Sequence, residues 1–154
     1  MRKYIAFVSA LACVLAMAGC GGKKASIDLP FEAGDVGNVE MYHFVGTPAS
    51  AEKKVVVADE TIQTLCDMFE GLPLERKEVE ETAGAETTSF RFNLSDGTSY
   101  ELIYSHYGEK TGSLKSSTGN FEYFTSEDIG SYWRDMELAA AAVEESELPQ
   151  YSGE

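Results

Sequence analysis

The sequence predicts an α+β protein, with a mainly antiparallel sheet of five to six strands and two amphipathic helices in the order β-β-α-β-β-β-β-α. Three observations lead to this prediction. A β-hairpin is centred on Asp96-Gly97, a helical stripe of apolar residues runs from Ile62 to Phe69, and a second stripe runs from Ile129 to Val143. Strands joined by tight turns pair antiparallel, which favours α+β over α/β.

Size and charge narrow the class of protein further. The chain has 154 residues, of which 44% are hydrophobic, and this is enough for one domain with its own core. It carries 12 basic and 26 acidic residues, a net charge of −14. Because this charge repels phosphate, the composition argues against a nucleic-acid partner.

The N-terminal residues have the pattern of a bacterial lipoprotein signal. Arg2 and Lys3 precede an apolar stretch, Tyr4–Met17, and the sequence Met17-Ala18-Gly19-Cys20 resembles a lipobox. We therefore expect a signal peptide over 1–19 and lipid attachment at Cys20, followed by a linker over 20–26. Cleavage removes the two positive charges of Arg2 and Lys3, so the net charge of −14 becomes −16. An ordinary secretory signal that happens to contain a cysteine is the alternative.

The predicted domain covers residues 27–145 and begins with two strands. Pro30 excludes a central strand near the start of this domain. The β-branched and aromatic residues of Val39–Val45 predict the first strand, and Val55–Val57 predicts the second. Residues 46–52, which contain Gly46 and Pro48, are expected to form the loop between them.

A helix is predicted directly after the second strand. Asp59 is its expected N-cap, and Gly71 is its expected left-handed C-cap. The apolar positions share one face, because they fall at i, i+3, i+4 and i+7: Ile62, Leu65, Cys66 and Phe69. We interpret Cys66 as a buried structural thiol. The glutamate-rich stretch 74–88 that follows is expected to be an acidic loop.

The hairpin over Ser89–Tyr104 can be assigned a register. A two-residue turn at Asp96-Gly97 would divide its large side chains between the two faces. With Ser95, Asp96 and Gly97 all in the turn, and Gly97 left-handed, Phe92 pairs with Tyr100 and the large side chains share one face. Burial therefore favours the longer, bulged turn, with Gly97 as its structural residue.

The C-terminal part of the domain is predicted to hold two short strands and a helix. Leu114 and Phe121–Phe124 mark the strands, and Thr125 with Asp128 has capping-box spacing. The helical stripe consists of Ile129, Trp133, Met136, Ala140 and Val143, and Ala139–Ala142 favours a helix. Residues 146–154 are acidic, contain Pro149, and are expected to fray.

Residue patterns for catalysis or cofactor binding are lacking in the sequence. His43 and His106 have no ligand partners at metal-site spacing, so neither a metal nor any other cofactor is predicted. A carboxylate-based hydrolase stays open as an alternative, with candidates Glu101, Glu122 and the cluster Glu78-Glu80-Glu81. The aromatic side chains Tyr100, Tyr104, Tyr107 and Tyr123 could line a groove, but core packing is the preferred interpretation.

Three stretches resemble a family of small lipoproteins of Gram-positive bacteria that is described only as a domain of unknown function. They are IDLPFE (27–32), SFRFNLSDGTSYELIYS (89–105) and YFTSEDIGSYW (123–133). The resemblance covers residues 27–133 and implies a lipid anchor at Cys20, with no catalytic residues to transfer.

The expected function is that of a non-catalytic binding or sensing module, anchored by lipid at the outer face of the cell membrane. Its acidic surface favours a basic protein or peptide partner, or divalent cations. An envelope hydrolase and an immunity or decoy lipoprotein are the alternatives.

Overall fold

The computed structural model describes residues 23–77, 84–106, 108, 112–119 and 121–150. The predicted signal peptide over 1–19, the lipid-attachment residue Cys20 and the acidic cluster Glu78-Glu80-Glu81 lie outside these residues. The strands are β1 (Lys23–Ala25), β2 (Val36–Val45), β3 (Glu52–Val56), β4 (Leu74–Arg76), β5 (Glu86–Leu94), β6 (Ser99–His106), β7 (Gly112–Ser116), β8 (Glu122–Thr125) and β9 (Ala141–Ala142). The helices are α1 (Asp59–Gly71) and α2 (Gly130–Asp135), with 3-10 turns at Ala33–Asp35, Pro48–Ser50 and Glu145–Glu147.

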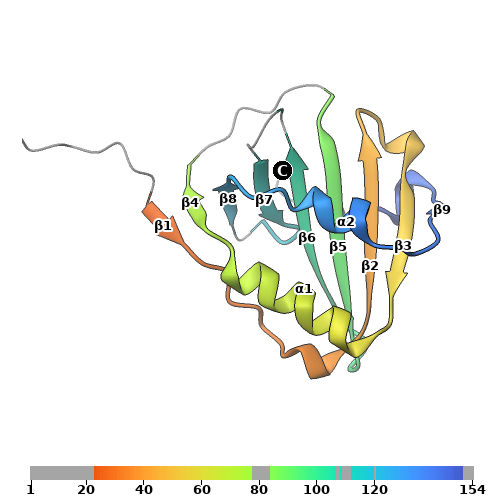
Figure 1. Cartoon of the computed structure of the whole chain (residues 1–154), viewed down its shortest axis with the longest axis horizontal. Coiled ribbons are helices and arrows are strands. Elements are labelled where there is room, and N and C mark those ends of the chain that lie inside the picture. The colour runs from red at the N-terminus through yellow and green to blue at the C-terminus, as the bar shows by residue number, and fades with distance from the viewer. Residues whose placement is uncertain (1–22, 78–83, 107, 109–111, 120, 151–154) are drawn as a thin grey trace, which may run out of the picture.

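Within the described part of the chain, the strands form one sheet of nine, in the order β1-β4-β8-β7-β6-β5-β2-β3-β9. Every neighbouring pair is antiparallel. The two helices cross the same side of this sheet (Figure 1). The α+β class is therefore confirmed. The predicted number of five to six strands is wrong, because β1, β4 and β9, of two or three residues each, were not expected.

The main core lies between the sheet and α1. The predicted stripe is confirmed, since Ile62, Leu65, Cys66 and Phe69 are all buried. Phe69 packs edge-on against Phe90, with ring centroids 4.9 Å apart. Complete burial of such an aromatic side chain stabilises the fold by about 2–3 kcal/mol, so this contact fixes α1 on the central strands.

The β5–β6 hairpin has the register that burial predicts. Phe92 pairs with Tyr100 and Phe90 with Leu102, so their side chains share the helix-bearing face. The turn is closed by the Leu94 N–H donating to the Thr98 carbonyl at 2.9 Å, and Gly97 has φ +86°. The bulged turn over Ser95–Gly97 is thus confirmed.

Gly97→Val is expected to destabilise the protein by about 2 kcal/mol or more, because a β-branched residue is strained at positive φ. Nothing lies within 4 Å of a Cβ added there, so the penalty comes from the backbone alone. Urea denaturation measures the loss, and Gly97→Asn is the matched control, since asparagine tolerates this conformation. A valine variant as stable as wild type contradicts the assignment of the turn.

The second helix is shorter than predicted. It spans Gly130–Asp135 and starts after Ile129, so a capping box at Thr125 and Asp128 is wrong. Thr125 ends β8 instead, and its hydroxyl accepts a bond from the Glu127 N–H. The predicted extension through Ala139–Ala142 is also wrong, because Ala141 and Ala142 pair with β3. Strand pairing over a long sequence distance has overridden helix propensity.

Three local predictions need correction near the ends of elements. Lys23–Ala25, placed in the linker over 20–26, pairs with β4. The expected acidic loop over 74–88 contains β4 at its start and the first residues of β5 at its end. Gly71 is the last residue of α1, and it does not have the positive φ of a left-handed cap.

The C-terminal residues fold back onto the sheet. Leu148 is only 5% exposed and packs with Tyr42 and Ala51 in a small second core. Tyr42 alternates along β2 with Met41, which belongs to the main core, so this second core lies on the face opposite the helices. The prediction of a frayed tail over 146–154 is therefore wrong for residues 146–150. Residues 151–154 lie outside the described part of the chain.

Candidate functional site

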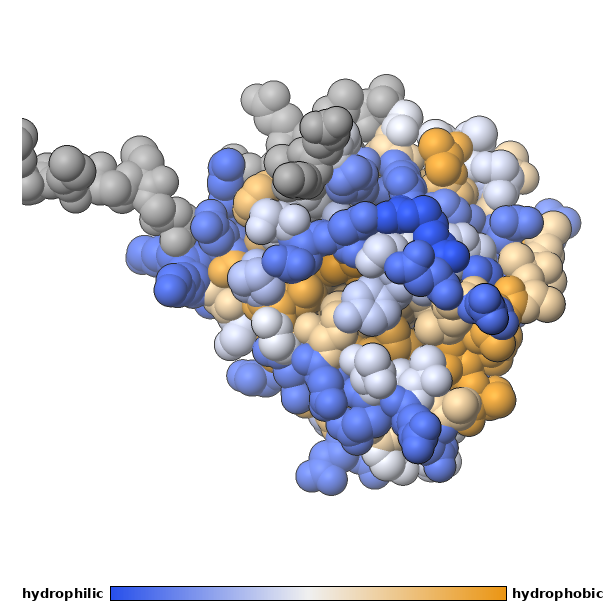
Figure 2. Space-filling model, in the orientation of Figure 1, coloured by the Kyte–Doolittle hydropathy of each residue, from blue (hydrophilic) through white to orange (hydrophobic). Residues whose placement is uncertain are grey.

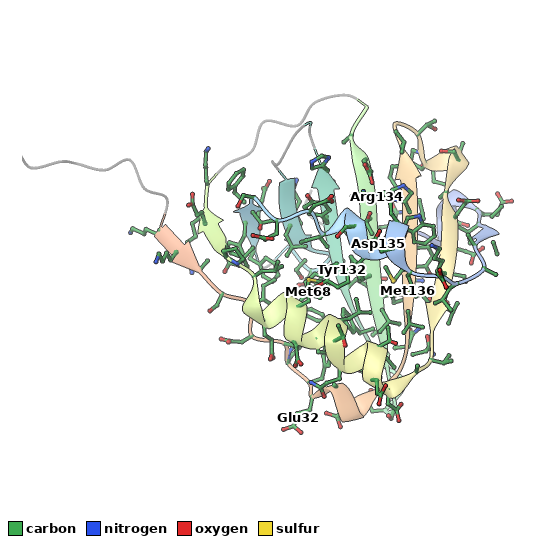
Figure 3. All side chains as sticks on the ribbon, in the orientation of Figure 1. Glu32, Met68, Tyr132, Arg134, Asp135 and Met136 are labelled. Carbon is green, nitrogen blue, oxygen red and sulfur yellow. The ribbon has the colours of Figure 1, made fainter. Side chains whose placement is uncertain are left out.

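A hollow lies beside α2 on the helix-bearing face of the sheet. It has a volume of about 410 Å³ and is lined by Ser131, Tyr132, Asp135 and Met136. Met68 of α1 lies on its other side, facing α2 (Figure 3). We call the surface formed by these five residues the helical hollow.

The helical hollow is apolar at its floor. Met68, Tyr132 and Met136 are partly buried and pack onto the main core. Figure 2 shows hydrophobic surface between two hydrophilic bands, where the helices run. Thioether and aromatic side chains adapt to the shape of an apolar ligand, so this combination suits a contact surface.

The charges around the helical hollow are mostly negative. Asp135 lines it directly, and Glu137, just beyond α2, is exposed. The sequence of α1 contains carboxylates but no lysine or arginine, and the carboxylates are Asp59, Glu60, Asp67 and Glu70. Arg134 of α2 is engaged by Glu86 at 2.7 Å and by Asp128. The surface is therefore complementary to a basic partner with apolar side chains.

A buried lysine holds α2 in place. Lys54 of β3 is 9% exposed, and its ammonium donates to the carbonyls of Trp133 at 2.7 Å and Met136 at 2.8 Å. The same ammonium lies 4.6 Å from the centroid of the Trp133 ring. A cation that bonds the last carbonyls of a helix satisfies groups that otherwise lack partners. Lys54 thereby positions Met136 in the helical hollow.

His43 supports α2 from the sheet. Its ring stacks on Trp133, with centroids 5.2 Å apart, and Nδ1 lies 3.1 Å from the Thr88 hydroxyl. Burial lowers the pKa of His43, aided by Arg134 and opposed chiefly by Glu86, whose carboxylate is 3.9 Å away. The folded protein therefore favours the neutral imidazole.

Stability is expected to fall as the pH drops below 6.5, the ordinary pKa of histidine. The unfolded chain binds the His43 proton more tightly than the folded chain does, so protonation favours unfolding until the lowered folded pKa is passed. Thermal unfolding between pH 7 and pH 5.5 measures this decrease, with charged groups Glu86, Glu52, Arg134 and Lys54 contributing to its size. His43→Gln should reduce the dependence of stability on pH over this range. An equal slope in wild type and His43→Gln contradicts the assignment.

The opposite face of the sheet carries a network of charged side chains centred on Arg91. This guanidinium donates to Glu101 at 2.5 Å, to Glu40 at 3.3 Å and to the Glu147 carbonyl at 2.9 Å. Burial opposes ionisation of Glu40, but hydrogen bonds from Tyr42, Lys53 and Arg91 outweigh it and hold the pKa of this carboxyl below its usual value. The network ties the C-terminal segment to β2 and β5.

The two hydrolase candidates that the structure describes lie in ion pairs. Glu101 pairs with Arg91, and Glu122 pairs with Lys115 at 3.4 Å. The geometry around Glu101 and Glu122 therefore favours structural ion pairs.

The remaining chemically interesting side chains belong to the structure of the core. Cys66 is buried as predicted, and burial, with smaller contributions from Glu70 and Asp67, raises the pKa of its thiol to about 11. Tyr104 is 1% exposed and donates to the Glu127 carbonyl at 3.1 Å, which confirms its role in packing. Tyr100 and Tyr123 pack at the edge of the same core, and Tyr107 lies outside the described residues.

Within residues 23–77, 84–106, 108, 112–119 and 121–150, no group of three or more histidine, cysteine, aspartate or glutamate side chains could hold a metal ion. Over the same ranges, no helix has the length and apolar character needed to cross a bilayer.

Sequence reasoning did not identify the helical hollow. The apolar spacing predicts Met136 as part of a helical stripe and predicts no role for Met68. The signal that could have found them is the position of Met68, three residues after Leu65, which widens the apolar stripe beyond the face that packs on the sheet. Comparison with protein-family models, curated proteins and solved structures found no match.

Proposed function

We propose that this chain is a lipid-anchored protein at the extracytoplasmic face of the membrane, and that its helical hollow binds an apolar segment of a basic peptide or protein. The lipobox-like sequence ending at Cys20 supports the location. The apolar floor formed by Met68, Tyr132 and Met136 is the observation that carries the binding function. The carboxylates of α1 supply attraction for the partner's cations.

The binding role is non-catalytic. The helical hollow contains one carboxylate, that of Asp135, and the hydroxyls of Ser131 and Tyr132. Within the part of the chain that the structure describes, no base is hydrogen-bonded to the Ser131 hydroxyl, which donates to the Asp128 carbonyl at 2.7 Å. An activated nucleophile requires a base within reach. Recognition through apolar contact and charge complementarity is what these side chains can supply.

The location is tested by mass spectrometry of the native protein. We expect a diacylglycerol-modified Cys20 at the new N-terminus, and we expect Cys20→Ser to abolish retention in the membrane fraction. An intact leader or an unmodified thiol at position 20 contradicts the proposed anchor.

The binding function is tested with a synthetic peptide that alternates leucine and lysine, against a matched peptide with glutamate in place of lysine. Fluorescence of Trp133, the single tryptophan of the chain, reports binding next to the helical hollow. We expect saturable binding of the basic peptide, and about a tenfold loss of affinity in Met68→Asp, since one buried apolar contact exchanged for a charge costs about 1.4 kcal/mol or more.

Val57→Asp is the matched control. Val57 follows β3 and is 70% exposed, so the substitution adds the same charge at an apolar residue away from the helical hollow. This variant should bind the basic peptide as wild type does. Equal affinity for both peptides, or an equal loss in both variants, counts against the helical hollow as the binding surface.

A further inference from the structure

A cluster of cations lies at one edge of this strongly acidic protein. In the β1–β4 pair, Lys23 lies opposite Arg76 and Lys24 lies opposite Glu75. Lys77 follows β4 directly, and all four cations are exposed. Among the described residues of these two strands and Lys77, Glu75 is the single carboxylate. We call Lys23, Lys24, Arg76 and Lys77 the basic edge.

Aromatic side chains of β8 support the basic edge. The Arg76 guanidinium lies 5.9 Å from the centroid of the Tyr123 ring, and the Lys77 ammonium lies 4.8 Å from that of Phe124. A hollow of about 280 Å³ beside them is lined by Lys24, Glu75 and Phe124 among other residues. Cation–ring contacts orient long side chains while their charges stay in water.

The basic edge is also the part of the fold nearest to the proposed anchor, and this step rests on the proposed function. Three peptide units join Cys20 to Lys23, so their Cα atoms are at most about 11 Å apart, at 3.8 Å per unit. The surface potential of anionic lipids extends about 8–10 Å at physiological salt. A lipid on Cys20 therefore keeps the basic edge at the range where this potential acts.

We propose that the basic edge lies against anionic lipid headgroups and sets the orientation of the protein on the membrane. The remaining surface of the protein is acidic, and the same headgroups repel it. Attraction of the basic edge and repulsion of the acidic surface therefore favour the orientation in which the basic edge faces the bilayer. The strand order puts β9 at the other end of the sheet. With neighbouring strands about 4.8 Å apart, β9 lies about 38 Å from β1 along the sheet, and it points away from the bilayer.

Fluorescence quenching in vesicles tests this orientation. The acylated protein carries a dye at Ser126→Cys, beside the basic edge, or at Glu137→Cys, near the β9 end, and buried Cys66 stays protected from labelling. A quencher on the lipid headgroups should act several-fold more strongly at position 126 in vesicles of equal phosphatidylglycerol and phosphatidylcholine. The difference should shrink in pure phosphatidylcholine and at high salt. Equal quenching at both positions overturns the proposal.

Charge variants identify the residues responsible. Neutralising the basic edge with Lys24→Gln and Lys77→Gln should abolish most of the difference between the two dye positions, because each cation near such a surface changes partitioning about fivefold. Lys53→Gln on β3 is a control that removes one cation away from the basic edge, and it should preserve the difference. If the basic-edge variant behaves as wild type, the proposal is wrong.

A separate measurement covers failure of the anchor. If Cys20 carries no lipid, the proposed location is wrong, but the basic edge can still bind anionic lipid. Sedimentation of Cys20→Ser protein with phosphatidylglycerol vesicles tests that binding without the anchor. Binding that weakens with salt and with Lys24→Gln and Lys77→Gln supports the basic edge. Absence of binding at low salt overturns it.

Discussion

Lys54→Met is expected to destabilise the protein by about 2–3 kcal/mol, although methionine fills a similar volume and suits a buried site. The substitution removes the donor to the Trp133 and Met136 carbonyls and leaves both at the end of α2 without this partner. A hydrogen bond from a charged group contributes about 1.5–3 kcal/mol, and part of the loss is regained by burying an apolar side chain. Urea denaturation measures the difference.

Lys53→Met is the matched control for this experiment. Lys53 is the preceding residue of β3, on the opposite face, and its ammonium pairs with Glu40 and Glu147. Partly exposed ion pairs of this kind contribute about 0–1 kcal/mol. The Trp133 emission should shift in Lys54→Met alone, and basic-peptide affinity should fall in that variant because Met136 loses its support. Similar losses of stability in both variants contradict the capping role.

Gly112→Ala is expected to cost about 3 kcal/mol of stability, a large effect for the addition of one methyl group. A Cβ at this position overlaps the Tyr104 ring, lying 2.6 Å from Cζ and 2.7 Å from the hydroxyl oxygen. Tyr104 is 1% exposed, and its hydroxyl is bonded to the Glu127 carbonyl, so the ring cannot move aside without breaking that contact. Overpacking in a closed core forces such shifts.

Gly71→Ala is the control that separates this clash from a general intolerance of glycine replacement. Nothing lies within 4 Å of a Cβ added to Gly71, and alanine favours the helix, so its stability should equal or exceed that of wild type. The double variant Gly112→Ala with Tyr104→Leu should lose less than the sum of the single losses, because the smaller side chain relieves the overlap. Strict additivity of the two losses contradicts the steric explanation.

The parts of the fold that the sequence predicts are those governed by local burial. The hairpin register follows from six large side chains that need one face, and the turn at Gly97 follows from that register. The helix over Asp59–Gly71 follows from its apolar spacing. Both inferences use residues close together in the chain, where the alternative registers or spacings are few enough to compare one by one.

The missed elements depend on contacts between distant residues. Ala141 and Ala142 favour a helix by themselves, and only pairing with Lys53 and Glu52 makes them a strand. Lys23–Ala25 has the sequence of a linker, and it is a strand only because it pairs with residues 74–76. The helical hollow also depends on distant residues, because Met68 lies in α1 and Met136 directly follows α2. The distance between these two side chains depends on how Lys54 and His43 position α2.

The two ends of the sheet have a consequence for self-association. An exposed strand edge offers free N–H and carbonyl groups on which a second chain can extend the sheet into an aggregate. Here the outermost strands have three and two residues, and two of the residues in β1 are lysines. Such short edge strands, one of them charged, offer a neighbouring molecule few groups for pairing. Many copies can therefore lie close together on one surface while each stays monomeric.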